Sequence, residues 1–285
     1  MYIRDSTDTV NKAVKIHNTS AVASAALGRV LTAAALMGSM AKEEAETVSL
    51  QFKGGGPIGT VFAVGNSHAY VKGYVTDPTV ELPLNKKGKL DVGGAVGRQG
   101  NLCVIRDDGV TGKPYIGQVR IATGEIGDDI NFYYASSEQI PTASGLGVLV
   151  DTDYTIKAAG GFIIQLLPRA DDTVIDTVEN GLKNVTSVTD LITKGKDAEE
   201  ILETVFGKIE IIGEEAPDYV CDCSEKRFEK GILSLGSEEI EGIIKDQGDA
   251  EIYCNFCNKR YLIKKQRLEE LLETAKKKEN IKNTN

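Results

Sequence analysis

Four of the chain's five cysteines are clustered near the C-terminus, and their type and spacing could do chemistry. They form two close pairs, Cys221 with Cys223 in the sequence CDC and Cys254 with Cys257 in the sequence CNFC, separated by thirty residues. Thiolates prefer zinc, and a structural zinc site takes four ligands, commonly as two short chelating pairs. The pattern therefore predicts one zinc ion held by all four cysteines, with two disulfides or four unrelated thiols as the alternatives.

The two pairs require different backbone geometry. CNFC is followed by Asn258, Lys259 and then apolar and aromatic residues, which predicts a tight turn between two short strands with both sulfurs pointing into it. In CDC a single residue separates the cysteines, and an extended chain would point their side chains to opposite sides. The backbone must therefore turn at Asp222 for both sulfurs to reach one ion.

Other residues with chemical potential give weaker signals. Cys103 lies in the apolar strand pattern LCVI, so we expect a buried small hydrophobe outside the metal site. The GGGPIG run at 54–59 lacks the Lys and the Ser or Thr of a P-loop and lies between two predicted strands, so it predicts a turn. The two histidines have no catalytic spacing, and SSEQ at 136–139 places no base beside its hydroxyls. We therefore predict that the protein is not an enzyme.

Length and composition describe an ordinary globular chain. Its 285 residues suffice for one good core and a satellite module, and no N-terminal stretch has the pattern of a signal peptide. The most apolar helix candidate, Ala21–Ala41, is rich in alanine and carries Arg29 in its middle. It is too weakly hydrophobic to span a bilayer, so we expect a buried core helix and no membrane partner. These features predict a cytoplasmic protein, where thiols stay reduced.

The charge distribution is uneven. The net charge of −9 argues against a nucleic-acid partner, because Lys and Arg that neutralise phosphates supply most of that affinity. Arg169–Val220 alone holds five basic and thirteen acidic residues, a net charge of −8. Nearly all of the excess therefore lies in one connecting segment.

The elements that must position the cysteines begin with an α+β domain. Ser20 is the expected N-cap of the alanine-rich helix, with apolar residues at helical spacing after it. From Thr47 the apolar period changes to that of strands, and the turns are rich in glycine. The strands we predict are 47–52, 59–64, 69–75, 102–106, 117–122, 147–150 and 155–167, with a further helix over 129–137. This mixed sheet with packed helices ends near Pro168.

The texture changes again after Pro168. Residues 171–185 and the shorter runs SVTDLITKG and DAEEILETVFGK predict amphipathic helices, which are marginal alone in water and need a surface to dock on. The apolar face of the last of these is Ile201, Leu202, Val205 and Phe206. The tail predicts one more helix whose Leu stripe more often forms core than a partner interface. We therefore predict an N-terminal domain at 1–168, an acidic helical linker at 169–217 and a C-terminal zinc module at 218–285.

These motifs together resemble one known family. The CDC and CNFC pairs, with ASAALGR, GGGPIG, GKLDV, GEIGDD, SSEQIP, AAGGFIIQLLP and SEKRF upstream and between them, are similar to the 33 kDa chaperonin family of redox-regulated holdase chaperones in the bacterial cytoplasm. The resemblance covers nearly the whole chain. That family also has a first strand ahead of the stretch matching MYIRDSTDTVNKA, and we expect that strand to be absent here.

The resemblance implies a mechanism. In that family the reduced, zinc-bound form is inactive and oxidation pairs neighbouring cysteines, which here would be Cys221 with Cys223 and Cys254 with Cys257. The module and linker then unfold, the surfaces they covered bind unfolding client proteins under stress, and the active form dimerises. Two other classes of function stay open: a zinc-ribbon nucleic-acid or translation factor, which the acidic balance disfavours, and a thiol oxidoreductase or zinc enzyme, which four cysteines disfavour because they close the metal's shell.

Overall fold

The structure is a computed structural model that describes residues 1–183, 185, 187–207, 210, 212–213 and 215–283. The chain divides into two compact units, Met1–Val220 and Cys221–Asn285. The predicted linker, 169–217, falls within the first unit. The predicted α+β class with a small C-terminal cysteine module is confirmed.

Helix α2 (Ala21–Gly38) forms the centre of the first unit. It begins where the sequence predicts, because the Ser20 side chain accepts a hydrogen bond from the amide of Ala23. Every residue of α2 except Ala21 and Arg29 is buried. The alanines and glycines allow neighbouring backbone to come close: a Cβ on Gly65 of the sheet above would lie 2.1 Å from the carbonyl oxygen of Ala34.

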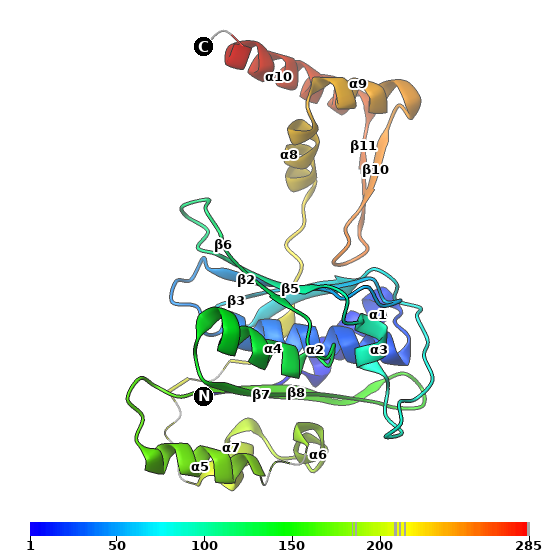
Figure 1. The fold of residues 1–285 in the computed structure, drawn as a ribbon. Helices are drawn as coiled ribbons and strands as arrows, with labels where there is room; N and C mark the ends of the chain where they lie inside the picture. The colour runs from blue at the N-terminus through cyan, green and yellow to red at the C-terminus, as the bar shows by residue number, and fades with distance from the viewer. Residues whose placement is uncertain (184, 186, 208–209, 211, 214, 284–285) are drawn as a thin grey trace. The chain divides into compact units, whose positions relative to one another are not determined.

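Two sheets enclose α2, whereas the sequence suggested one (Figure 1). The larger has six strands in the order β6-β5-β2-β3-β4-β9, antiparallel except for the parallel β4–β9 pair. Its strands are β2 (Thr47–Lys53), β3 (Thr60–Asn66), β4 (Tyr70–Val75), β5 (Asn101–Asp107), β6 (Tyr115–Arg120) and β9 (Asp218–Tyr219). GGGPIG forms the turn between β2 and β3, as predicted.

The smaller sheet has three antiparallel strands in the order β1-β8-β7. They are β1 (Tyr2–Asp5), β7 (Thr142–Val150) and β8 (Ile156–Gln165). Sequence reasoning missed β1, which lies within the stretch MYIRDSTDTVNKA: Tyr2 pairs with Ile163 and Asp5 with Gly160 of β8. The alternation of Ile3 with polar neighbours over four residues was too short to indicate a strand from the sequence.

Short helices complete the first unit. Helix α1 (Thr7–His17) packs on α2 and β8, and α4 (Gly127–Tyr133) continues into the one-turn π-helix η1 (Tyr134–Glu138). Helix α3 (Val92–Val96) is a single turn capped by the Asp91 side chain. The linker contributes α5 (Asp172–Lys183), α6 (Val188–Thr193) and α7 (Ala198–Phe206), which lie on the face of the three-stranded sheet opposite α2 (Figure 1). The linker helices therefore cover apolar side chains of β1 and β8.

The second unit is a hairpin with three helices. Its elements are α8 (Glu225–Leu235), α9 (Ser237–Asp246), β10 (Ala250–Tyr253), β11 (Arg260–Ile263) and α10 (Lys265–Asn283). Leu268, Leu271 and Ala275 of α10 are buried, so the predicted Leu stripe is core. The core is small, and its buried residues are Ile232, Ile240, Ala250, Ile263, Leu268, Leu271 and Ala275. Residues 284 and 285 lie outside the described residues.

Our argument that α2 is too weakly hydrophobic to cross a membrane was wrong. Within the described residues α2 is one helix that is long and apolar enough to do so by length and composition, with a mean hydropathy of 1.5. However, 89% of that stretch is buried inside the protein. Its packing between two sheets, and not its hydropathy, is what makes it a core helix.

Candidate metal centre

The sulfurs of Cys221, Cys223, Cys254 and Cys257 lie within 4.8 Å of one another, so all four predicted ligands come together. The Sγ atoms of Cys221 and Cys254 are 3.7 Å apart, and those of Cys223 and Cys257 are 3.4 Å apart. These distances are too long for disulfide bonds, and all four cysteines are free. The alternative of two standing disulfides does not describe this structure.

The turn between β10 and β11 positions the second pair. Its closing hydrogen bonds run from the amide of Cys254 to the carbonyl of Lys259, at 3.0 Å, and from the amide of Asn258 to the carbonyl of Cys254, at 2.8 Å. Asn258 has a φ of 57°, a left-handed conformation that Asn tolerates better than most residues. The predicted turn between two short strands is thus confirmed.

The first pair is held by the start of α8. Ser224, directly after Cys223, caps this helix by accepting a hydrogen bond from the amide of Arg227. The guanidinium of Arg227 pairs with the carboxylate of Asp222 and also donates to the carbonyl oxygen of Asp222, at 3.2 Å. The residue between the two cysteines is therefore tied to the helix that follows them.

The cluster fits a tetrahedral zinc ion. With Zn–S bonds of about 2.3 Å, tetrahedral geometry puts the sulfurs about 3.8 Å apart. The distances of 3.7 Å and 3.4 Å are close to that value, and the limit of 4.8 Å for the whole set requires only small adjustments. The four side chains can therefore hold a metal ion, and an all-thiolate set favours zinc among the common divalent metals.

The thiols differ in acidity. Burial raises the pKa of both Cys221 and Cys257 above the ordinary value for cysteine. Burial also acts to raise the pKa of Cys223, but the hydrogen bond from Tyr261 and those from the other cysteines outweigh it and lower this pKa to about 7. A divalent cation would favour the thiolate at every position, because a coordinated thiol is deprotonated.

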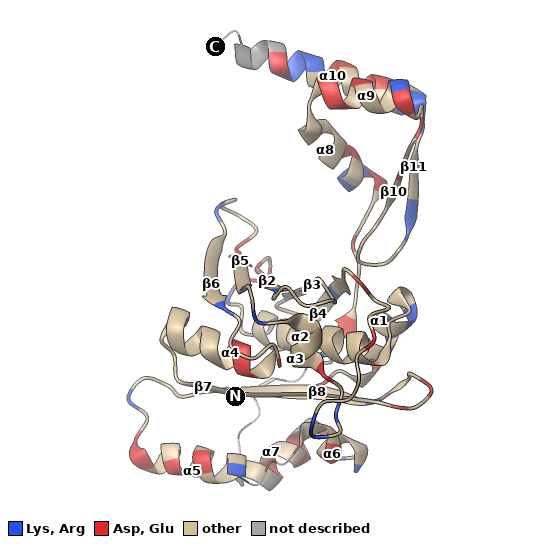
Figure 2. Cartoon of the chain, turned by 45° about the vertical axis from the view of Figure 1, so that its right-hand side comes forward, with Lys and Arg blue, Asp and Glu red and all other residues tan. Residues whose placement is uncertain are grey.

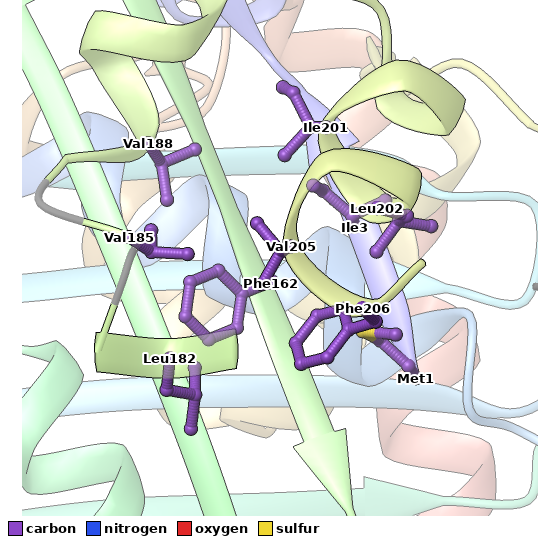
Figure 3. Close-up of a pocket in the computed structure, with 10 residues that line it drawn as sticks. All are labelled: Met1, Ile3, Phe162, Leu182, Val185, Val188, Ile201, Leu202, Val205 and Phe206. Atoms are coloured by element: carbon purple, nitrogen blue, oxygen red, sulfur yellow. The ribbon is translucent and has the colours of Figure 1, made fainter. Parts of the chain in front are cut away.

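The apolar residues predicted on the last linker helix face the three-stranded sheet. Ile201 is buried in a cluster with Ile3 of β1 and Phe162 of β8, and Leu202 and Phe206 pack against it. Figure 3 shows the side chains of the linker helices gathered around Phe162. They line a small apolar cavity, whose residues are Met1, Ile3, Phe162, Leu182, Val185, Val188, Ile201, Leu202, Val205 and Phe206.

The other side of the linker helices is acidic. In Figure 2 the ribbon of α5 and α7 carries Asp and Glu positions, coloured red. Glu199, Glu200 and Glu203 of α7 are exposed, and Asp197 and Glu200 form a capping box at its start. The amphipathic pattern predicted for this helix is therefore confirmed, with its apolar residues on the sheet.

Sequence reasoning missed the strand β9, which ends the first unit just before Cys221. Tyr219 is 2% exposed, and its hydroxyl donates to the carbonyl of Gly73, at 2.7 Å. The same hydroxyl accepts from the amide of Gly73 at 3.2 Å and lies 3.1 Å from Nε2 of His17. A strand of two residues has no periodicity, so only its partner strand could have disclosed it.

Cys103 is not buried as predicted. It lies half-buried on β5 between Leu102 and Val104, both of which are fully buried. Alternate side chains of a strand point to opposite faces, so Cys103 lies on the outer face of the six-stranded sheet. Cys103 is not one of the four clustered cysteines, which agrees with the prediction that it lies outside the metal site.

Together the fold and the cysteine cluster define an α+β protein whose second unit carries four cysteines that could hold a metal ion. A model of the Hsp33 protein family matches residues 1–264. The 33 kDa chaperonin of Caldanaerobacter subterraneus subsp. tengcongensis is 52% identical over 95% of this chain and 92% of its own length. The 33 kDa chaperonin of Clostridium acetobutylicum is 51% identical over 90% of this chain and 87% of its own length.

A solved structure agrees with these sequence matches. The crystal structure of the 33 kDa chaperonin, a heat shock protein 33 homologue, of Thermotoga maritima matches with a TM-score of 0.84 and 39% identity. The match covers 94% of this chain and 91% of that one. The chain therefore belongs to the Hsp33 protein family, as its motifs indicated, and its class of function is that of a chaperone.

Proposed function

We propose that the protein is a redox-regulated holdase chaperone, inactive while its four cysteines bind zinc and active after they are oxidised. The observation that carries the proposal is that four free thiols lie within 4.8 Å of one another in a unit with a small core. The residues that would hold the ion are Cys221, Cys223, Cys254 and Cys257. A bound zinc ion would supply a cross-link between the two cysteine pairs, and thus folding energy for the unit.

Magnitudes support such a switch. The binding free energy of a structural zinc is about 10–16 kcal/mol. The net stability of a whole domain is only about 5–15 kcal/mol. A unit with the small core of Cys221–Asn285 can therefore depend on its thiolates for its fold.

Oxidation would remove these ligands. Two thiolates joined as a disulfide lose two electrons, and hydrogen peroxide that takes them up with two protons becomes two water molecules. We propose the pairs Cys221 with Cys223 and Cys254 with Cys257, each of which closes a very short loop. Such bonds leave the two halves of the unit unconnected, so they constrain the unfolded chain little. Strain in short loops also favours reduction, which makes the change reversible.

The linker would provide the client-binding step. Its apolar residues Ile201, Leu202, Val205 and Phe206 are covered only while α7 lies on β1 and β8. We propose that loss of the C-terminal fold loosens α5–α7, and that the apolar surfaces then uncovered bind unfolding proteins. An exposed apolar patch is what a general binder of unfolded chains requires. The acidic face of the linker would keep the open form soluble.

One sample can test the whole sequence of events. Zinc release and suppression of a model protein's aggregation are followed together while hydrogen peroxide and mild heat are applied, and a digest of the same sample maps the disulfides by mass spectrometry. We expect both signals to appear together, to reverse with a thiol reductant, and to accompany disulfides within each pair. Aggregation suppression by the reduced, zinc-loaded protein that oxidation does not increase would refute the proposal.

The location, oligomeric state and lack of catalysis are also part of the proposed function. We propose that the protein acts in the cytoplasm, that the oxidised form is a homodimer, and that it catalyses no turnover. Sedimentation of the oxidised and reduced forms tests the second point, and a doubling of mass on oxidation is expected. Salt-dependent RNA binding by the reduced form would instead favour a translation factor.

A further inference from the structure

Tyr261 is a residue outside the four cysteines whose side chain contacts one of them. Its hydroxyl lies 3.1 Å from the sulfur of Cys223 and donates to the carbonyl oxygen of the same residue at 3.0 Å. Tyr261 belongs to β11, whereas Cys223 precedes α8, so this contact joins the two cysteine-bearing segments of the unit. One phenol proton thus has two acceptors within reach on a single residue.

The ring of Tyr261 is held firmly in this position. Tyr261 is only 8% exposed, and its backbone pairs with Ile252 across the hairpin. The ring of Phe228 lies against it, with centroids 4.9 Å apart at 47°, and the ammonium of Lys259 lies 5.2 Å from its centroid. These contacts fix the hydroxyl before any ligand binds, which is the requirement for a residue that tunes a site through a hydrogen bond.

The direction of the hydrogen bond follows from the chemistry of the sulfur. A Cys223 thiol could donate its own proton to the phenol, but a sulfur that ligates a metal has none. In the metal-binding state the phenol is therefore the only possible donor of the pair. A donor on a thiolate withdraws electron density from the sulfur and stabilises its charge, and hydrogen bonds to sulfur shift the redox behaviour of metal–thiolate centres in the same sense.

We propose that Tyr261 is a positioning residue that holds the Cys223 sulfur in the metal-binding arrangement and slows its attack on peroxides. The inference rests on the proposed function, since it concerns the same oxidation, in which two thiolates give two electrons to the peroxide and form a disulfide. It adds a residue that sets how much oxidant the switch needs.

The chain offers a matched control in the same hairpin. Tyr253 directly precedes Cys254, but it is 57% exposed and its hydroxyl bonds to the carboxylate of Glu251. Tyr261→Phe and Tyr253→Phe each remove one hydroxyl and keep the ring. A difference between these two variants therefore reports the contact with Cys223 and not the loss of a hydroxyl from the hairpin.

The test uses the full chain loaded with zinc or with cobalt(II). Competition with a chelator measures zinc affinity, stopped-flow measures the rate of zinc release by hydrogen peroxide, and the sulfur-to-cobalt charge-transfer band reports electron density on the thiolates. We expect Tyr261→Phe to bind zinc roughly 10-fold or more weakly, as for other residues behind a metal ligand, to release it several-fold faster, and to shift the band to lower energy. Tyr253→Phe should match the wild type.

Each other outcome has a defined meaning. A Tyr261→Phe variant whose melting temperature falls while its charge-transfer band and release rate stay at the wild-type values has lost only packing, and this inference is then wrong. The same holds if the two variants behave alike. A wild-type chain that binds no zinc overturns the proposed function, whereas wild-type binding with an unaffected Tyr261→Phe overturns this inference alone.

Discussion

At the scale of single residues, two tyrosines are placed near the CDC segment in different ways: one precedes it in the sequence, and the other contacts Cys223. Tyr219, two residues before Cys221, belongs to the first unit, and its hydroxyl satisfies both the carbonyl and the amide of Gly73. Tyr261 is in the second unit and contacts Cys223. The end of the linker is further fixed by Thr9, whose hydroxyl donates to the carbonyl of Pro217 at 2.7 Å. The chain just before Cys221 is therefore anchored to the rest of the first unit.

Replacing Tyr219 should loosen this anchor. Tyr219→Phe leaves two buried backbone groups of Gly73 without their partner, and an unsatisfied buried group costs about 1–3 kcal/mol. We expect hydrogen exchange to show that β9 loses protection by roughly that amount. Tyr70→Phe is the control, because Tyr70 lies on the neighbouring strand but is exposed. Equal protection of β9 in both variants would contradict the anchoring role.

At the scale of elements, the linker helices depend on the sheet beneath them. Helix α7 has nine residues and α6 has six, lengths at which an isolated helix is marginal in water. The helices also pack closely on one another: a Cβ on Gly181 of α5 would lie 2.7 Å from both the ring of Phe206 and the carbonyl oxygen of Val205. Their fold is therefore conditional on docking.

Removing the apolar face of α7 should activate the chaperone without oxidant. In the variant with Ile201, Leu202, Val205 and Phe206 all changed to Ser, we expect the reduced, zinc-loaded protein to suppress aggregation, because α7 no longer covers β1 and β8. Light scattering of a thermally unfolding test protein measures this. Glu199→Gln with Glu203→Gln, on the exposed side of the same helix, should remain inactive. A serine variant that stays inactive with its zinc bound would refute the masking role of α7.

At the scale of the whole molecule, the two units differ in what holds them together. The first has a large core around α2 between two sheets, and the second has few buried side chains around its hairpin and helices. The helices α8 and α9 of the second unit bury one residue each, Ile232 and Ile240. We therefore expect the fold of the second unit to depend on its cysteines, and the core of the first not to.

Chelation should unfold the second unit and leave the core of the first unit folded. With a strong zinc chelator and a reductant, we expect amides within Cys221–Asn285 to lose protection from exchange, those of α5–α7 to weaken next, and those of α2 and the six-stranded sheet to remain protected. Cys254→Ser should do the same without chelator, because it removes one ligand. A second unit that keeps its protection after complete zinc removal would show that its small core suffices.

The local elements could be predicted from the sequence because their signals are local. Ser20 as a helix cap, the strand alternation after Thr47, the amphipathic stripe of 201–206 and the CNFC turn each depend on residues near one another in the chain. The two cysteine pairs indicated a shared site because two short chelating pairs far apart in the sequence are a common pattern of structural zinc sites. Their family motifs extended this to the class of protein.

The rest depended on partners distant in the sequence. β1 and β9 are too short to have a period of their own, and they are strands because β8 and β4 pair with them. Long-range packing likewise decides three other features. They are the division into two sheets around α2, the place of Cys103 on the outer face of its sheet, and the contact of Tyr261 with Cys223. The sequence by itself determined which residues could bind a metal and which faces were apolar. Only the tertiary structure decided what those faces cover and which side chain touches the sulfur, because such contacts join segments whose spacing carries no local signal.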